Sequence, residues 1–119
     1  MTAQSDRFTV EMVGDVALVR LTDRKILDEE QIQILGAQLF QLVEQRNINQ
    51  IVLSFRDVEY YSSAGLGKLI TLNKKVGTAK GKIVFCAMIP EIREVFNITH
   101  LDKFFNIEPT EPKALDFMS

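Results

Sequence analysis

The sequence predicts an α/β fold with a mixed β-sheet, in which an antiparallel hairpin comes first and parallel strands joined by helices follow. Two β-prone runs near the N-terminus are separated by a glycine–aspartate pair. Farther along, short apolar runs alternate with stretches of helical spacing. The chain has 119 residues, of which 46% are hydrophobic and 25% charged. We therefore expect residues 1–119 to form a single domain with its own core.

The hairpin is predicted over Phe8–Val13 and Val16–Leu21. Between these runs, Gly14 and Asp15 form a two-residue loop of the type that closes tight hairpins. Residues 22–27 are mostly polar and are predicted as a loop. The domain therefore opens with an antiparallel pair of strands.

Asp28 and Gln31 predict the start of the first helix. With these residue types three positions apart, each side chain can accept a hydrogen bond from the backbone N–H of the other, which is a capping box. The helix is predicted to run to about Arg46. Its apolar side chains recur every three or four residues and form one face: Ile32, Leu35, Leu39, Leu42 and Val43.

A buried strand and a second helix flank two consecutive serines. Residues 51–55 are almost wholly apolar, as in a strand that is covered on both faces. After the serines, apolar residues keep helical spacing. They predict a helix from Ser62 or Ser63 to about Val76, with Gly77 as its C-terminal stop.

The C-terminal part predicts a further strand over residues 83–87 and a short helix over residues 91–97. Pro90 fits the first turn of this helix, where its missing N–H would have no partner in any case. Residues 104–107 are predicted as a last short strand and residues 112–117 as a last helical turn or two.

Three of the predicted strands are connected through helices and should therefore run parallel to one another. The loops that follow them then emerge at the same edge of the sheet. In open α/β sheets this carboxyl edge is the usual place for binding. The loops concerned are residues 22–27, 58–62 and 88–90.

Composition excludes several functions. The net charge of −2 offers no basic excess for a nucleic-acid partner. The single cysteine, Cys86, lies in an apolar run, and the single histidine, His100, in a predicted turn, so the usual zinc sites cannot form. No stretch approaches 18 apolar residues, and residues 1–7 lack the apolar segment of a secretion signal. We expect a cytoplasmic protein without membrane insertion.

The motifs of cofactor binding are incomplete. Residues 65–70 begin like a dinucleotide fingerprint but have Ile70 where its third glycine belongs. Residues 77–82 are one position short of a phosphate-binding P-loop, and Ile83 stands where a serine or threonine would hold magnesium. No serine lies in a G-x-S-x-G motif. We therefore expect no catalytic residue, no cofactor and no metal.

The pair Ser62 and Ser63 has two interpretations. A serine at a helix start commonly accepts a hydrogen bond from a free backbone N–H, but capping explains one serine and not two. The same position, at the positive end of the helix dipole, also accommodates a phosphate well. Gly65 and Gly67 lie in the first helical turns, where glycine costs roughly 1 kcal/mol relative to alanine. They indicate close approach by another backbone of the domain or by a partner.

Residues 57–67, which contain both serines, are similar to a motif of a known family. They resemble the strand-to-helix segment around the phosphorylated serine in the STAS domain of bacterial anti-sigma factor antagonists. Residues 86–96 are similar to that family's fourth strand and short helix. The order of elements fits as well, so the resemblance covers nearly the whole chain.

The resemblance implies a phosphorylation switch. In the family, a serine kinase that is also an anti-sigma factor modifies the serine two positions before the motif glycine, here Ser63. The unmodified form binds the anti-sigma factor and frees a sigma factor, phosphorylation releases the anti-sigma factor, and a phosphatase resets the switch. Many members have aspartate where this chain has Ser62, which leaves Ser62 as a competing acceptor. The partner-binding residues implied are Asp28, Tyr61, Ser62, Ser63, Gly65, Leu66, Lys68 and Met88.

Two alternatives stay open. The domain could be a fixed structural subunit of a transporter-associated or stress-sensing assembly, with Ser63 only a cap. A nucleotide-binding domain has only the incomplete glycine motifs in its favour. A phosphate acceptor should be exposed at the start of the second long helix. If Ser63 is the cap, Ser63→Ala should cost about 1 kcal/mol of stability. Ser62→Ala should have little effect on partner binding or on phosphorylation.

Overall fold

A computed structural model describes residues 7–119. The expectation that residues 1–7 form no secretion signal therefore lies, except for Arg7, outside the described part of the chain. A five-stranded sheet with the order β1-β2-β4-β6-β7 forms the centre of the fold. β1 and β2 are antiparallel, and each further pair is parallel. The predicted fold class is confirmed. The strands are β1 Phe8–Val13, β2 Val16–Leu21, β4 Gln50–Ser54, β6 Lys82–Cys86 and β7 Asn106–Glu108.

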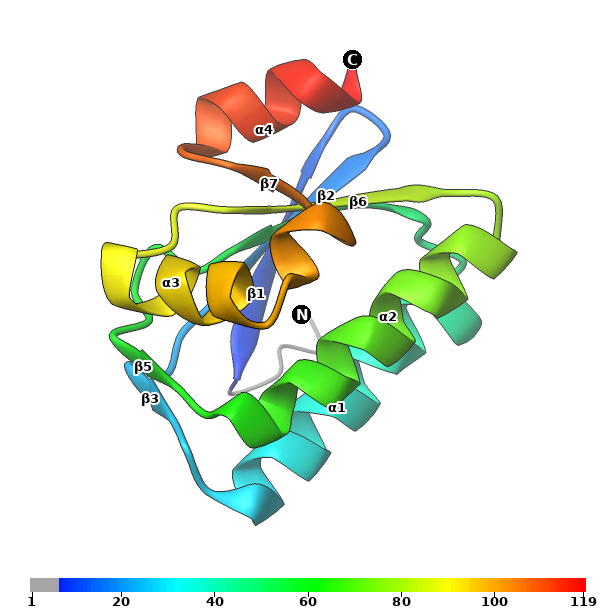
Figure 1. Ribbon diagram of the computed structural model, residues 1–119. Helices are drawn as coiled ribbons and strands as arrows, with labels where there is room; N and C mark the ends of the chain where they lie inside the picture. The colour runs from blue at the N-terminus through cyan, green and yellow to red at the C-terminus, as the bar shows by residue number, and fades with distance from the viewer. Residues whose placement is uncertain (1–6) are drawn as a thin grey trace.

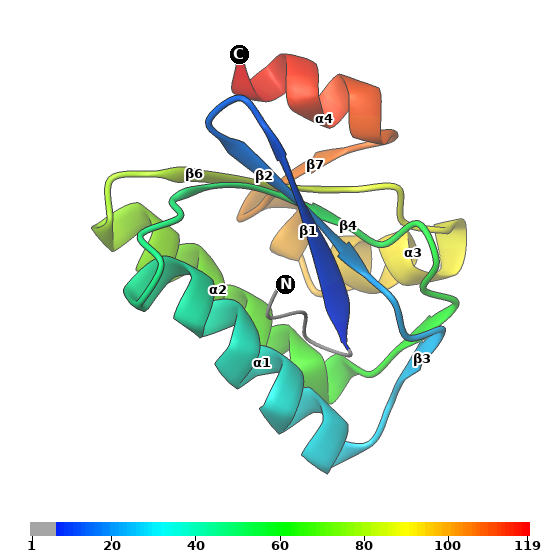
Figure 2. The ribbon, with the colours of Figure 1, turned by 180° about the vertical axis from the view of Figure 1, so that it is seen from behind.

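Helices cover both faces of this sheet (Figures 1 and 2). One face carries α1 Glu29–Glu44, α2 Leu66–Thr78 and α3 Pro90–Ile98, and the other carries α4 Glu111–Met118. Successive strand residues point to opposite faces. In β4, for example, Leu53 belongs to the large core under the first three helices, whereas Val52 belongs to a smaller core under α4. The near-continuous apolar runs of the sequence therefore reflect burial on both sides.

The start and end of α2 differ from the prediction. A 3₁₀ turn, η1 Ser63–Gly65, precedes the helix, which itself begins at Leu66. At the other end, α2 continues through Gly77 to Thr78. The stop is provided by Lys80, which has a φ of 61°, and by the N–H of Gly81, which donates to the carbonyl of Val76 at 2.9 Å. This pattern is a Schellman motif with lysine in the left-handed position usually taken by glycine.

The last strand also differs from the prediction over residues 104–107. A 3₁₀ turn, η2 Leu101–Lys103, leads into β7, and only the residues of β7 pair with β6. Phe105 lies outside the strand. It is an apolar core residue because its ring stacks on that of Phe85, with 4.7 Å between the centroids. The predicted short helix that starts at Pro90 and the predicted C-terminal helix are confirmed.

Candidate functional site

Two very short strands join the loops at the carboxyl edge of the sheet. β3 Lys25–Ile26 and β5 Tyr60–Tyr61 pair in parallel and form a separate two-stranded sheet. The backbone N–H of Ser62 extends this pairing, because it donates to the carbonyl of Ile26 at 2.9 Å. The prediction of simple loops here is wrong, but the prediction that both loops lie at the same edge is correct. The main chain just before Ser63 is therefore held by hydrogen bonds to the loop after β2.

A second set of bonds fixes the loop after β2. The Gln31 side chain accepts from the N–H of Asp28 at 3.4 Å, as part of the predicted capping box at the start of α1. Its amide nitrogen donates to the carboxylate of Asp23 at 3.0 Å and to the carbonyl of Lys25 at 2.8 Å. At the outer side, Arg24 and Glu59 form a two-bond ion pair at 2.8 and 3.0 Å. The loop is thus attached both to α1 and to the segment that leads to the serines.

The two serines have different roles. The Ser62 hydroxyl oxygen accepts a hydrogen bond from the N–H of Ala64 at 3.1 Å, and Ser62 is half-buried. Ser63 is exposed, and within residues 7–119 its hydroxyl makes no hydrogen bond. The cap is therefore Ser62, which corrects the assumption that Ser63 would be the capping residue. The predicted exposure of Ser63 at the entry to the second long helix is confirmed.

Of the residues expected to bind a partner, Gly65 and Leu66 are buried and Tyr61 is half-buried. The Tyr61 hydroxyl donates to the carbonyl of Gly65 at 2.9 Å, and its ring meets Phe55 edge-on at a centroid distance of 5.6 Å. Burial raises the pKa of the Tyr61 phenol well above its usual range. Leu66 is only 7% exposed and is part of the core. Tyr61, Gly65 and Leu66 thus shape the base on which Ser63 is presented.

The glycines of the motif differ in their surroundings. A Cβ at Gly65 would lie 2.7 Å from the Tyr61 hydroxyl oxygen, so the close approach expected at this position comes from a side chain of the same domain. A Cβ at Gly67 would meet nothing within 4 Å. Of the two motif glycines, only Gly65 is therefore required by packing within the domain.

Asp28, Lys68 and Met88 lie in three different settings. Asp28 is exposed at the start of α1. The Lys68 stem packs against Gly36 of α1, and its ammonium lies 5.9 Å from the centre of the Phe40 ring. Met88 follows β6 and lines a cavity next to α3. The structure therefore brings Ser62 and Ser63 together with Tyr61 and Gly65, whereas Met88 belongs to a separate hollow.

Two exposed apolar residues beside the serines escaped the sequence analysis. Leu27 is 53% exposed and follows β3, and Tyr60 is 51% exposed in β5. The Lys25 ammonium lies 5.4 Å from the centre of the Tyr60 ring. The sequence could have pointed to Leu27 and Tyr60, because each is an apolar residue within a segment that was predicted as a loop. Leu27, Tyr60, Ser62 and Ser63 define what we call the serine surface.

The described residues offer little chemistry besides the serines. Within residues 7–119, no cluster of three or more His, Cys, Asp or Glu side chains is placed to hold a metal ion. Cys86 is buried, and burial raises the pKa of its thiol to about 11. No helix in this part of the chain is long and apolar enough to cross a membrane. The serine surface itself presents two exposed apolar side chains and one exposed hydroxyl.

Comparisons with known proteins agree with this arrangement. A family model described as the STAS domain matches residues 8–114. The anti-sigma F factor antagonist of Paenibacillus polymyxa is 26% identical over 100 residues, which cover 84% of each chain. Among solved structures, an anti-sigma factor antagonist from Mycobacterium paratuberculosis has a TM-score of 0.81 at 27% identity, covering 93% of this chain and 92% of that one. A candidate anti-sigma factor antagonist from Thermotoga maritima has a TM-score of 0.82 at 25% identity, covering 95% of each chain.

Proposed function

Because the chain belongs to the STAS domain family, we propose that it acts as an anti-sigma factor antagonist controlled by phosphorylation of Ser63. In this proposal the unmodified protein binds an anti-sigma factor that is also a serine kinase, and so releases a sigma factor. Phosphorylation ends the binding, and a phosphatase restores it. The protein acts in the cytoplasm by binding alone, without catalysis.

The observation that carries the proposal is the division of roles between the two serines. Ser62 accepts the capping hydrogen bond, so the exposed hydroxyl of Ser63 is left for a kinase. A phosphate on Ser63 breaks no hydrogen bond of the folded domain. It adds a charge of about −1.5 to −2 at the start of a helical segment, where negative charge is favourable. The modified domain therefore stays folded.

The serine surface explains why the modification would end binding. Leu27 and Tyr60 are exposed apolar side chains that a partner can cover. A partner that covers them also encloses Ser63. With a phosphate present, the interface would have to bury a dianion, which is strongly unfavourable without a matching cation. The same surface that gives affinity thus makes affinity sensitive to the charge of one side chain.

The test compares binding of four variants to the anti-sigma factor, identified first by co-purification from native lysate. Ser63→Asp should weaken binding by about tenfold or more, because it places a charge within the interface. Ser63→Ala should bind like the original protein and accept no phosphate from the kinase. Ser62→Ala should still be phosphorylated at Ser63. Thr78→Asp adds the same charge at the exposed far end of α2 and serves as the control.

A fixed structural subunit would behave differently. Mass spectrometry of the protein from its native source would find no phosphate at Ser63, and Ser63→Asp would bind its partner as well as the original chain does. Either result would contradict the proposal. A phosphate found on Ser62 instead would assign the switch to the neighbouring hydroxyl.

A further inference from the structure

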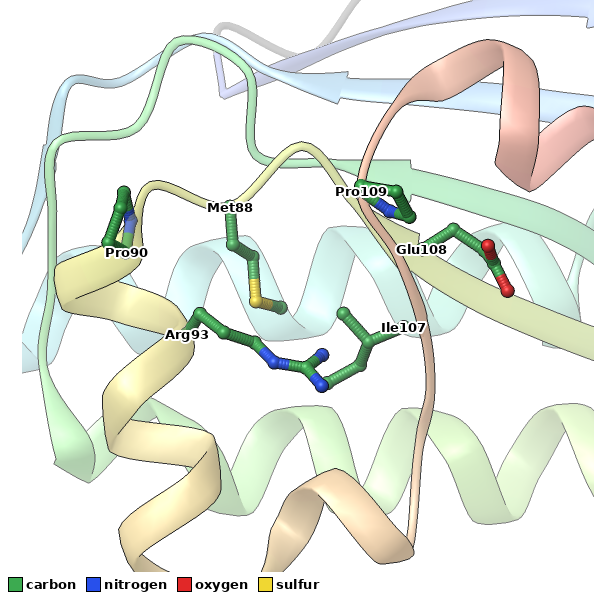
Figure 3. A pocket seen from close by; sticks show the side chains of 6 residues that line it. All are labelled: Met88, Pro90, Arg93, Ile107, Glu108 and Pro109. Carbon is green, nitrogen blue, oxygen red and sulfur yellow. The ribbon is translucent and has the colours of Figure 1, made fainter.

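A cavity of about 400 Å³ lies between the loop after β6, the start of α3 and the end of β7 (Figure 3). A volume of this size is typical of pockets that hold small molecules. The cavity is lined by Met88, Pro90, Arg93, Ile107, Glu108 and Pro109. None of these residues belongs to the serine surface on which the proposed function rests.

Most of the cavity wall is apolar. Met88 and Ile107 are half-buried and pack on the main core, and Figure 3 shows both side chains pointing into the same space. Pro90 and Pro109 lie on either side of them. These residues come from two separate segments of the chain, 88–90 and 107–109, which converge because β6 and β7 are neighbours in the sheet. An aliphatic or aromatic group would gain contacts with this wall.

Arg93 is the cationic group of the cavity. It is half-buried, and its guanidinium extends from α3 across the space toward Ile107 (Figure 3). Within residues 7–119 it makes no ion pair and no side-chain hydrogen bond. By contrast, Arg20 and Arg24 each bind a carboxylate. Glu108 also lines the cavity, but its carboxylate is directed away from Arg93 in Figure 3.

A half-buried guanidinium without an acceptor is suited to a carboxylate. Its planar N–H groups can donate two parallel hydrogen bonds to the two oxygens, with the charge of each group neutralised by the other. We propose that the cavity binds a small amphipathic monocarboxylate. The carboxylate pairs with Arg93, and the apolar body lies against Met88, Ile107 and the two prolines. Binding needs neither phosphorylation of Ser63 nor an anti-sigma factor, so it is independent of the proposed function.

The test is a titration of the full chain, followed by the amide resonances of the protein, with hexanoate as the probe. Hexanol and hexylamine have the same chain length and lack the carboxylate. Hexanoate should shift the resonances of residues around Met88, Arg93 and Ile107 in a saturable way. It should bind at least about tenfold more tightly than hexanol, because the ion pair contributes only with the carboxylate. Hexylamine should bind more weakly than both.

Two arginine variants give the matched comparison. Arg93→Gln should weaken hexanoate binding by about tenfold and leave hexanol binding nearly unchanged. Arg46→Gln, which alters an exposed arginine beyond α1, should affect neither ligand. Ile107→Trp fills the cavity and should abolish binding of both ligands while the other resonances stay dispersed. The proposal fails if hexanoate and hexanol bind equally, if the shifts map elsewhere, or if Arg93→Gln has no effect. In that last case Arg93 only covers apolar surface with its stem.

Discussion

At the scale of single residues, the division between Ser62 and Ser63 would separate stability from the regulation that we propose. One hydroxyl is part of the fold, because it satisfies a backbone N–H at the start of a helical segment. The adjacent hydroxyl contributes nothing to the fold and is free to be modified. With two consecutive serines, one hydroxyl can cap the helical segment while the other accepts a phosphate. A single serine would have to do both. A phosphate on the capping oxygen would change the cap itself.

This division predicts unequal effects of two similar substitutions on stability. Ser62→Ala should lower the free energy of unfolding by about 0.5–2 kcal/mol, because it removes the hydrogen bond to Ala64. Ser63→Ala should change it by less than about 0.5 kcal/mol, as expected of an exposed residue without partners. Urea unfolding of the two variants measures both values. A larger loss for Ser63→Ala than for Ser62→Ala would contradict the assignment of the cap.

The two motif glycines give a second prediction. Gly65→Ala should destabilise the protein by about 1–3 kcal/mol, because the new methyl group would press on the Tyr61 ring, which is half-buried and packed against the core. Gly67→Ala should stabilise it by up to about 1 kcal/mol, because the site is open and alanine favours a helix. Thermal unfolding of the two variants compares them directly. Stabilisation by both substitutions would show that the Tyr61 ring moves aside without penalty.

At the scale of elements, the sequence predicted whatever was long or periodic. The capping box and apolar face of α1 located that helix to within two residues at its C-terminal end. β3 and β5 could not be predicted in this way, since two residues show no periodicity and their pairing depends on contacts 35 positions apart in the chain. The sequence could also point to Ser63 but could not show which of the two serines is the cap. That assignment depends on where η1 begins.

One element, α4, is attached to the second face of the sheet by a buried polar group. Glu111, at the start of α4, accepts hydrogen bonds from Arg20 at 2.9 and 3.0 Å and from the hydroxyl of Ser54 at 2.6 Å. Ser54 is fully buried. The Arg20 guanidinium, with help from Ser54, lowers the pKa of the Glu111 carboxyl below its ordinary value. The docking of α4 is therefore coupled to the ionisation of one carboxylate.

This coupling predicts how stability depends on pH. Because the pKa of Glu111 is lower in the folded protein, its contribution is complete above its ordinary pKa of about 4.5 and is lost as the pH falls through the lower, folded value. Glu111→Gln should therefore reduce stability at neutral pH and flatten the loss of stability below about pH 4.5. Urea unfolding between about pH 3 and pH 7 measures this. Glu94→Gln, at an exposed position on α3, should leave the profile unchanged.

At the scale of the whole molecule, an aromatic cluster joins β6 to the end of β4, to α3 and to the segment before β7. The Phe85 ring in β6 contacts Phe55, Phe96 and Phe105, with centroid distances of 6.1, 6.4 and 4.7 Å. Phe96 belongs to α3, and Phe105 lies just before β7. Residues from three other segments thus depend on the Phe85 side chain.

Truncation of this side chain should affect the entire fold. Phe85→Ala should lower the free energy of unfolding by about 3–5 kcal/mol, as for other buried aromatics, out of a total of about 5–15 kcal/mol for a domain. Phe117→Ala, which removes a 40% exposed ring from α4, should cost less than about 1 kcal/mol. Chemical denaturation of both variants tests the difference. Similar losses for the two would indicate that the cluster is loosely packed.

The strand order β1-β2-β4-β6-β7 has a consequence for synthesis of the protein. Each strand of the main sheet adds to the edge left by the strand before it, and no later strand inserts between two earlier ones. A chain that leaves the ribosome from its N-terminus can therefore build the sheet in the order of translation. Of the elements of this domain, the hairpin emerges first, and α4, which covers the second face, emerges last. Until α4 emerges, the apolar side chains of Leu18, Val52 and Val84 stay uncovered on the nascent sheet, so α4 is the element that ends the exposure of this face to aggregation.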